Sequence, residues 1–119
     1  MDYPNDADGD ALRRVASDGS DMSKPMEIDF VVSAPSEDAA NAIAYVAQAR
    51  GFRTKVCRDA DEEDEDIVTT WSCYCTRTMV ATYRGVIRVQ AELDAISRPL
   101  GGHADGWGTF GNAPDSRAG

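Results

Sequence analysis

The feature that most constrains the fold is a run of apolar residues spaced alternately three and four apart in the C-terminal half. These residues are Met79, Tyr83, Val86, Val89, Leu93, Ile96 and Leu100. Apolar positions at this spacing share one side of an α-helix, so the run predicts a long amphipathic helix over residues 79–100. Such a helix has to bury its apolar side against another layer of structure.

Four extended segments are predicted to supply that layer. Residues 27–33 and 52–57 alternate between apolar and polar side chains, residues 67–76 are rich in β-branched and aromatic side chains, and residues 103–110 form a last extended segment. Alternation with period two places successive side chains on opposite faces of a strand. We therefore expect a four-stranded sheet in which residues 67–76 are central.

Two further helices complete the predicted order of elements. Residues 11–18 show a short helical pattern that ends at Gly19, and an alanine-rich helix is expected over residues 36–50. After the lead-in helix the order is β-α-β-β-α-β, which is typical of a ferredoxin-like sandwich. We expect an α+β fold in which the two main helices cover one face of an antiparallel sheet.

The length of 119 residues suits one domain. We expect that domain to occupy residues 11–110, with a flexible acidic N-terminus over residues 1–10 and a flexible C-terminus over residues 111–119. The N-terminal residues do not resemble an export signal, and no apolar run approaches the roughly 20 residues that cross a membrane. The sequence therefore predicts a cytoplasmic protein with no membrane association.

The charge of the chain restricts its partners. Twelve Lys and Arg residues against 21 Asp and Glu residues give a formal charge of -9, which opposes binding to nucleic acid and favours a basic protein partner. The densest acidic run, from Asp59 to Asp66, is expected to form an exposed loop between two strands. Its candidate partner-binding residues are Asp61, Glu62, Glu63 and Asp64.

The cysteines offer little for catalysis or metal binding. Cys73 and Cys75 fall on one strand face about 7 Å apart by strand rise, which is too far for an unstrained disulfide. Besides Cys57, His103 is the only other side chain of the Cys/His type, so a zinc site is poorly supplied. We expect packing thiols, with no catalytic residue, metal or cofactor. An enzyme using Cys73 or Cys75 is the competing hypothesis.

The segment Asp105-Gly106-Trp107-Gly108-Thr109-Phe110 is not explained by composition. Glycines weaken a strand, so two of them beside Trp107 suggest unusual torsions or a close backbone approach around an anchored ring. Asp105 has the side chain to bond nearby backbone amides. Two readings stay open: a glycine-lined slot that seats Trp107 in the core, or a groove that binds a partner.

This segment also resembles a known family. A DGWGT sequence followed by an aromatic residue, directly after a long helix, is similar to the closing motif of the ribonuclease E inhibitor family RraB. Asp18-Gly19-Ser20-Asp21 looks like the DGSD start of that family, and Gly51-Phe52 resembles its step from helix to strand. The resemblance covers residues 11–110. Residues 112–119 stand where the family carries a long acidic tail.

The resemblance implies a ferredoxin-like domain that binds the regulatory scaffold part of an essential endoribonuclease and lowers RNA cleavage without being a nuclease. It makes Asp18, Asp21, Asp105 and Trp107 candidate partner-binding residues. A second hypothesis fits the same size and charge: an immunity-type protein that neutralises a basic nuclease. The sequence leaves the oligomeric state open.

Overall fold

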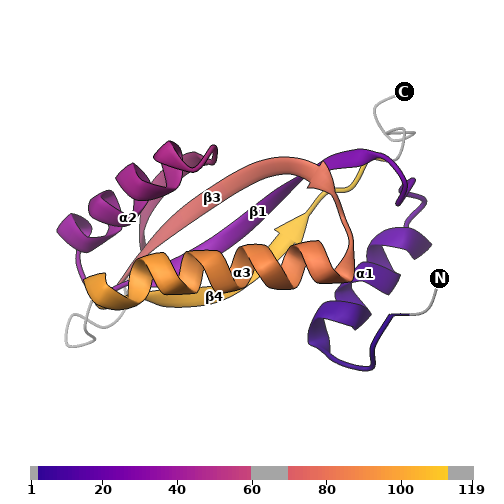
Figure 1. The fold of residues 1–119 in the computed structure, drawn as a ribbon, viewed down its shortest axis with the longest axis horizontal. Helices are drawn as coiled ribbons and strands as arrows, with labels where there is room; N and C mark the ends of the chain where they lie inside the picture. Colours follow the sequence, from indigo (N-terminus) through magenta and orange to yellow (C-terminus); the bar gives the residue numbers. More distant parts are fainter. Residues whose placement is uncertain (1–2, 60–69, 113–119) are drawn as a thin grey trace.

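The part of the chain that the structure describes folds into three α-helices and one four-stranded antiparallel sheet (Figure 1). The structure is a computed structural model that describes residues 3–59 and 70–112. Along the chain the elements are α1 (Ala7–Ser17), β1 (Pro25–Ala34), α2 (Glu37–Ala49), β2 (Arg53–Asp59), β3 (Thr70–Val80), α3 (Tyr83–Ser97), the short 3₁₀ helix η1 (Arg98–Leu100) and β4 (His103–Thr109). The predicted α+β fold with ferredoxin-like element order is confirmed.

The sheet has the strand order β2-β3-β1-β4. β1 pairs antiparallel with both β3 and β4, and β2 pairs antiparallel with β3. α2 and α3 lie on the same side of this sheet, while α1 lies beside the start of α3 (Figure 1). The opposite face of the sheet is not covered by either main helix.

The core lies between the sheet and the two main helices. Alternate residues of β1 are buried there, namely Met26, Ile28, Phe30, Val32 and Ala34. The helices contribute Ala40, Ile43, Ala47, Val86, Val89 and Leu93. The small alanine side chains of α2 let this helix approach the sheet closely. The period-two pattern of β1 and the helical pattern of α2 each place apolar side chains on one face, and these two faces pack together.

α1 begins at Ala7, four residues before the predicted start at residue 11. The carboxylate of Asp6 caps the helix by accepting a hydrogen bond of 2.8 Å from the amide of Gly9. A Cβ at Gly9 would lie 1.9 Å from the carbonyl oxygen of Pro4, so only glycine permits this entry. Gly9, which lies in the stretch predicted to be a flexible N-terminus, is therefore needed for the first turn of the helix.

The boundary between β3 and α3 was also predicted wrongly. Met79 was assigned to the helix, but it lies in β3 and pairs with Met26 of β1. α3 starts at Tyr83, where the hydroxyl of Thr82 accepts a hydrogen bond of 3.0 Å from the amide of Gly85. At the other end, Pro99 lies in η1 rather than in the α-helix, because a proline ring removes a helical hydrogen bond.

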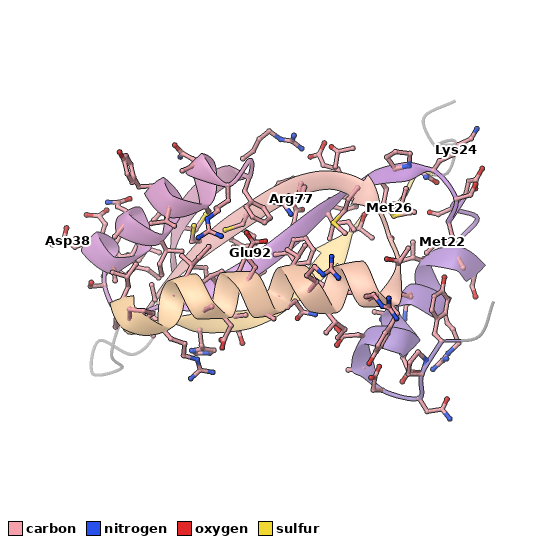
Figure 2. All side chains as sticks on the ribbon, in the orientation of Figure 1. Met22, Lys24, Met26, Asp38, Arg77 and Glu92 are labelled. Atoms are coloured by element: carbon pink, nitrogen blue, oxygen red, sulfur yellow. The ribbon has the colours of Figure 1, made fainter. Side chains whose placement is uncertain are left out.

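A cluster around Arg77 joins the end of α2 to α3. Arg77 donates to the carbonyl of Arg50 at 2.8 Å, and its guanidinium carbon lies 3.8 Å from the centroid of the Phe52 ring. Glu92 of α3 pairs with Arg50 at 3.2 Å and with Arg77 at 4.0 Å. Figure 2 shows Arg77 and Glu92 between the two helices, with their charged groups close together.

Candidate protein-interaction surface

Trp107 connects β4 to the N-terminal helix α1. It lies in β4 opposite Phe30 and packs against the core. Its indole nitrogen donates a hydrogen bond of 2.7 Å to Oδ1 of Asp8 in α1, and the amide of Gln90 in α3 donates to the same oxygen at 3.1 Å. The ring therefore fixes α1 against the sheet and α3.

A second carboxylate holds the start of α1. The hydroxyl of Tyr83 donates to Oδ2 of Asp6 at 2.5 Å. This bond, together with the one from the amide of Gly9, lowers the pKa of Asp6 below its usual value. The same bond raises the pKa of Tyr83, because it stabilises the protonated hydroxyl. Asp6 and Asp8 were not among the predicted site residues.

The glycines beside Trp107 do not line a slot for its ring. A Cβ at Gly106 or Gly108 would meet no atom within 4 Å. Gly106 instead has φ 115°, a conformation that L side chains rarely adopt. It lies where the pairing of β4 with β1 shifts register between Phe30 and Val32. Trp107 is thus partly buried against the core, but the glycines beside it form no slot for the ring, and Gly106 is needed for its backbone conformation.

Residues 18–21, here called the DGSD turn, connect α1 to β1. Asp18 is the C-terminal cap of α1 and is exposed, and Gly19 has φ 99°. Oδ1 of Asp21 accepts hydrogen bonds from the hydroxyl and amide of Ser23, at 2.6 and 3.0 Å. These bonds, the hydroxyl bond foremost, lower the pKa of Asp21. The turn is therefore a well-braced acidic corner.

Asn112 locks the DGSD turn from the far end of the chain. Its side-chain oxygen accepts from the amide of Asp21 at 2.7 Å. Its side-chain nitrogen donates to the carbonyls of Asp21, Lys24 and Pro25 at 2.9, 3.2 and 3.2 Å. The backbone amide of Asn112 also donates to the hydroxyl of Ser20 at 3.2 Å. Nothing in the local sequence distinguishes this asparagine, because all of its partners are distant in the chain.

The remaining predicted residues do not join this surface in the same way. Asp105 is exposed, its Oδ1 lies 4.0 Å from Nε2 of His103, and within residues 3–59 and 70–112 its carboxylate makes no hydrogen bond. The backbone bonds expected of Asp105 are therefore not formed there. Asp61, Glu62, Glu63 and Asp64 lie outside the described residues.

The cysteines of β3 are placed for packing. Cys73 and Cys75 are free and fully buried, with their sulfur atoms 3.7 Å apart. Their hydrogen bond and their burial raise the pKa of Cys75, which disfavours its thiolate. His103 pairs with Ser33, while Cys73 pairs with Val32. Since neighbours along a strand face opposite ways, the imidazole and the thiol lie on opposite faces of the sheet.

Two further properties concern metals and membranes. The described part of the chain holds no group of three or more His, Cys, Asp or Glu side chains placed to bind a metal ion. Among the same residues, no helix is both long and apolar enough to cross a bilayer.

Comparison with known proteins identifies the family. The family model described as "Regulator of ribonuclease activity B" matches residues 5–109, which is most of the chain. A comparison with curated protein sequences gives no match. The matched region includes α1, the DGSD turn and the strand that carries Trp107. The chain therefore belongs to the RraB family of regulators of ribonuclease activity.

Proposed function

We propose that this protein regulates a ribonuclease by binding it, acts in the cytoplasm, and has no nuclease activity of its own. Its membership of the RraB family supports a ribonuclease as the partner. The formal charge of -9 supports a basic binding segment on that enzyme, because complementary charge speeds and orients association. The partner segment we propose is the arginine-rich regulatory scaffold region of endoribonuclease E.

The observation that carries this proposal is the braced acidic corner of the DGSD turn. Asp18 and Asp21 are both exposed, and the four side-chain hydrogen bonds of Asn112 fix the backbone that holds Asp21. A surface that is already ordered loses less conformational entropy when it binds. The nearby Lys24 is a weak competitor for the carboxylate of Asp21, since the two groups are 4.0 Å apart and exposed.

Trp107 acts on this surface at a distance. Its bond to Asp8 secures the first turn of α1, and the DGSD turn follows the last turn of the same helix. We assign Trp107 the role of positioning α1, and through it the acidic corner, rather than of contacting the partner.

Isothermal titration calorimetry against the scaffold region of the same organism's endoribonuclease tests the proposal. The double variant Asp18→Asn/Asp21→Asn should bind roughly tenfold more weakly at low salt, a loss of about 1.4 kcal/mol. The matched control is Glu37→Gln/Asp38→Asn, which removes the same charge from the first turn of α2. Figure 2 shows Asp38 at the opposite end of the molecule from Lys24.

Two results would contradict the proposal at different points. No heat from the unmodified protein at low salt, where electrostatic attraction is strongest, would rule out the scaffold as partner. An equal loss in both double variants would show that net charge alone matters and that the DGSD turn is not the contact.

A further inference from the structure

β2 forms a regular, open edge of the sheet. The strand order leaves two edges, β2 and β4. Along β4 the pairing with β1 shifts register between Phe30 and Val32, and such irregularities keep an edge from accepting another strand. β2 pairs with β3 without a shift from Arg53 to Asp59, and no described strand lies on its outer side. That side therefore offers a row of main-chain donors and acceptors to a further strand.

The charged side chains of β2 form a pattern that complements itself. Arg53 begins the strand and Asp59 ends it on the same face, and both are exposed. The hydroxyls of Ser72 and Thr70 in β3 donate to the carboxylate of Asp59 at 2.7 and 3.3 Å, which holds it in place. Arg53 pairs with Glu27 at 3.3 Å, but both groups are exposed, so this pair is a weak competitor.

We propose that β2 pairs with β2 of a second copy of this chain, antiparallel and about a two-fold axis at Val56. All seven residues of each strand are then paired. The directly opposite residues are Arg53 with Asp59, Thr54 with Arg58, Lys55 with Cys57, and Val56 with itself. Two ion pairs therefore close the ends of the joined strands, and no like charges face each other.

Other registers bring like charges together or shorten the pairing. With the axis at Lys55, two lysines would face each other. With the axis half a residue to either side of Val56, Arg58 would face Arg53 or Lys55. Like charges directly opposite each other destabilise a strand pair. With the axis at Cys57, the first two residues of each strand would be left unpaired.

The proposed axis also falls beside an exposed tyrosine of α2. Tyr45 is 77% exposed in the single chain. Gln48, one turn later, donates to Thr54 of β2 at 2.6 Å, so this side of α2 faces the β2 edge, while α3 lies on its other side (Figure 1). From Thr54 to Val56 the strand advances about 6.6 Å, which is about four residues of helix. Because α2 runs antiparallel to β2, the axis lies level with Tyr45.

In the joined sheet the two α2 helices pack side by side. Opposite residues of an antiparallel pair share a face, so both copies keep α2 on the same side. α2 lies over β2 and β3, and strands are about 4.8 Å apart, which puts the two helix axes about 10 Å apart, a normal packing distance. Tyr45 then packs against its counterpart across the axis.

Sedimentation equilibrium of the full chain tests the pairing. At 0.15 M salt the screening length is about 8 Å, which reduces repulsion between two copies of charge -9. The interface is small, so the dissociation constant should lie between about 10 μM and 1 mM. The average mass should therefore rise towards that of two chains over this range of concentration.

Charge reversal tests the register. Arg53→Asp and Asp59→Arg should each weaken association at least about tenfold, because each sets like charges opposite each other twice per dimer. The double variant Arg53→Asp/Asp59→Arg exchanges the two signs and should return to within about threefold of the unmodified protein. The control Arg14→Asp makes the same charge change in α1 and should alter association less than about threefold. Tyr45→Ala should weaken association about tenfold.

Each contrary result overturns a stated part of the inference. A chain that stays monomeric at about 1 mM would show that Lys55 protects this edge from pairing. A double variant that does not regain association would overturn the register, and loss in Tyr45→Ala alone would leave a helix contact without strand pairing. This inference does not rest on the proposed function, which calorimetry tests separately because Asp18 and Asp21 are unchanged in these variants. The DGSD turn stays accessible, since α1 is bonded to β4 at the opposite edge of the sheet.

Discussion

Trp107 and Asp8 are 99 positions apart in the sequence and are joined by one hydrogen bond. The carboxylate of Asp8 keeps a second donor, Gln90, when the indole is removed. The partial burial of the ring adds an apolar contribution to that of the bond. Trp107 should therefore contribute to stability as well as to the position of α1.

Replacing Trp107 with phenylalanine should lower the free energy of unfolding by about 1–3 kcal/mol, through the lost bond and the smaller ring. Urea denaturation followed by circular dichroism measures this change. Phe110→Ala is the control, since Phe110 is fully exposed at 102% and should change stability by less than about 0.5 kcal/mol. A Trp107→Phe protein as stable as the control would refute the anchoring role.

The Tyr83 to Asp6 bond makes stability depend on pH. The folded pKa of Asp6 lies below its unfolded value, so the stabilisation is present above the unfolded pKa and is lost as pH falls through the folded pKa. The pKa of Tyr83 is raised, so the bond is also lost as pH rises through that value. Tyr83→Phe should lower the urea midpoint near neutral pH, and this difference should shrink as the pH falls through the folded pKa of Asp6. A difference that persists in acid would mean that packing, rather than the bond, is what the variant loses.

At the scale of helices and strands, local pattern predicted which elements form but not all of their limits. The alternation through Ile28, Phe30 and Val32 gave β1 correctly because one face of that strand is buried. Met79 fits both a strand and the helical spacing to Tyr83, and only pairing with Met26 decides between them. That pairing joins two residues from different halves of the chain, so no local pattern contains it.

The Arg77 cluster is an element-scale contact that the sequence did not indicate. Arg77→Leu should lower the free energy of unfolding by about 1–3 kcal/mol, because the cation–π contact and the bond to the last turn of α2 are both lost. Its control is Arg53→Leu on the neighbouring strand. Arg53 pairs with Glu27 at 3.3 Å, but both side chains are exposed, so that loss should stay below about 1 kcal/mol. Equal losses measured by urea unfolding would contradict a specific role for Arg77.

The candidate site was also only partly predictable, because local sequence shows its segments but not their long-range contacts. The DGSD and DGWG segments were identifiable as sequence, and Gly19 and Gly106 have the positive φ angles that such segments suggest. Their hydrogen-bond partners, Asp8 and Asn112, lie more than 80 residues away in the sequence. Long-range contacts of this kind follow from topology and not from local spacing.

For the whole molecule, charge is distributed unevenly. The described residues contain thirteen Asp and Glu side chains and eleven Lys and Arg side chains. The run from Asp61 to Asp66 contains six acidic residues and no basic one. Most of the formal charge of -9 therefore belongs to residues outside the two described ranges. Steering of a basic partner at long range should depend on that run more than on the described residues.

Neutralising the six acidic residues from Asp61 to Asp66 with Asn and Gln changes the formal charge from -9 to -3. The association rate with the ribonuclease scaffold should fall about tenfold at low salt, while the dissociation rate changes little. Stopped-flow fluorescence measures both rates, and high salt should abolish the difference. A main effect on dissociation would place these carboxylates in the bound interface instead.

The place of β1 in the sheet has a consequence for how the protein is made. β1 is the first strand to be synthesised, yet its neighbours on either side, β3 and β4, come from residues 70–80 and 103–109. During translation it has no partner on one side until the segment containing Trp107 has left the ribosome. β1 therefore cannot complete its pairing on both sides until β4 has been made, and until then its open edge can pair with other chains.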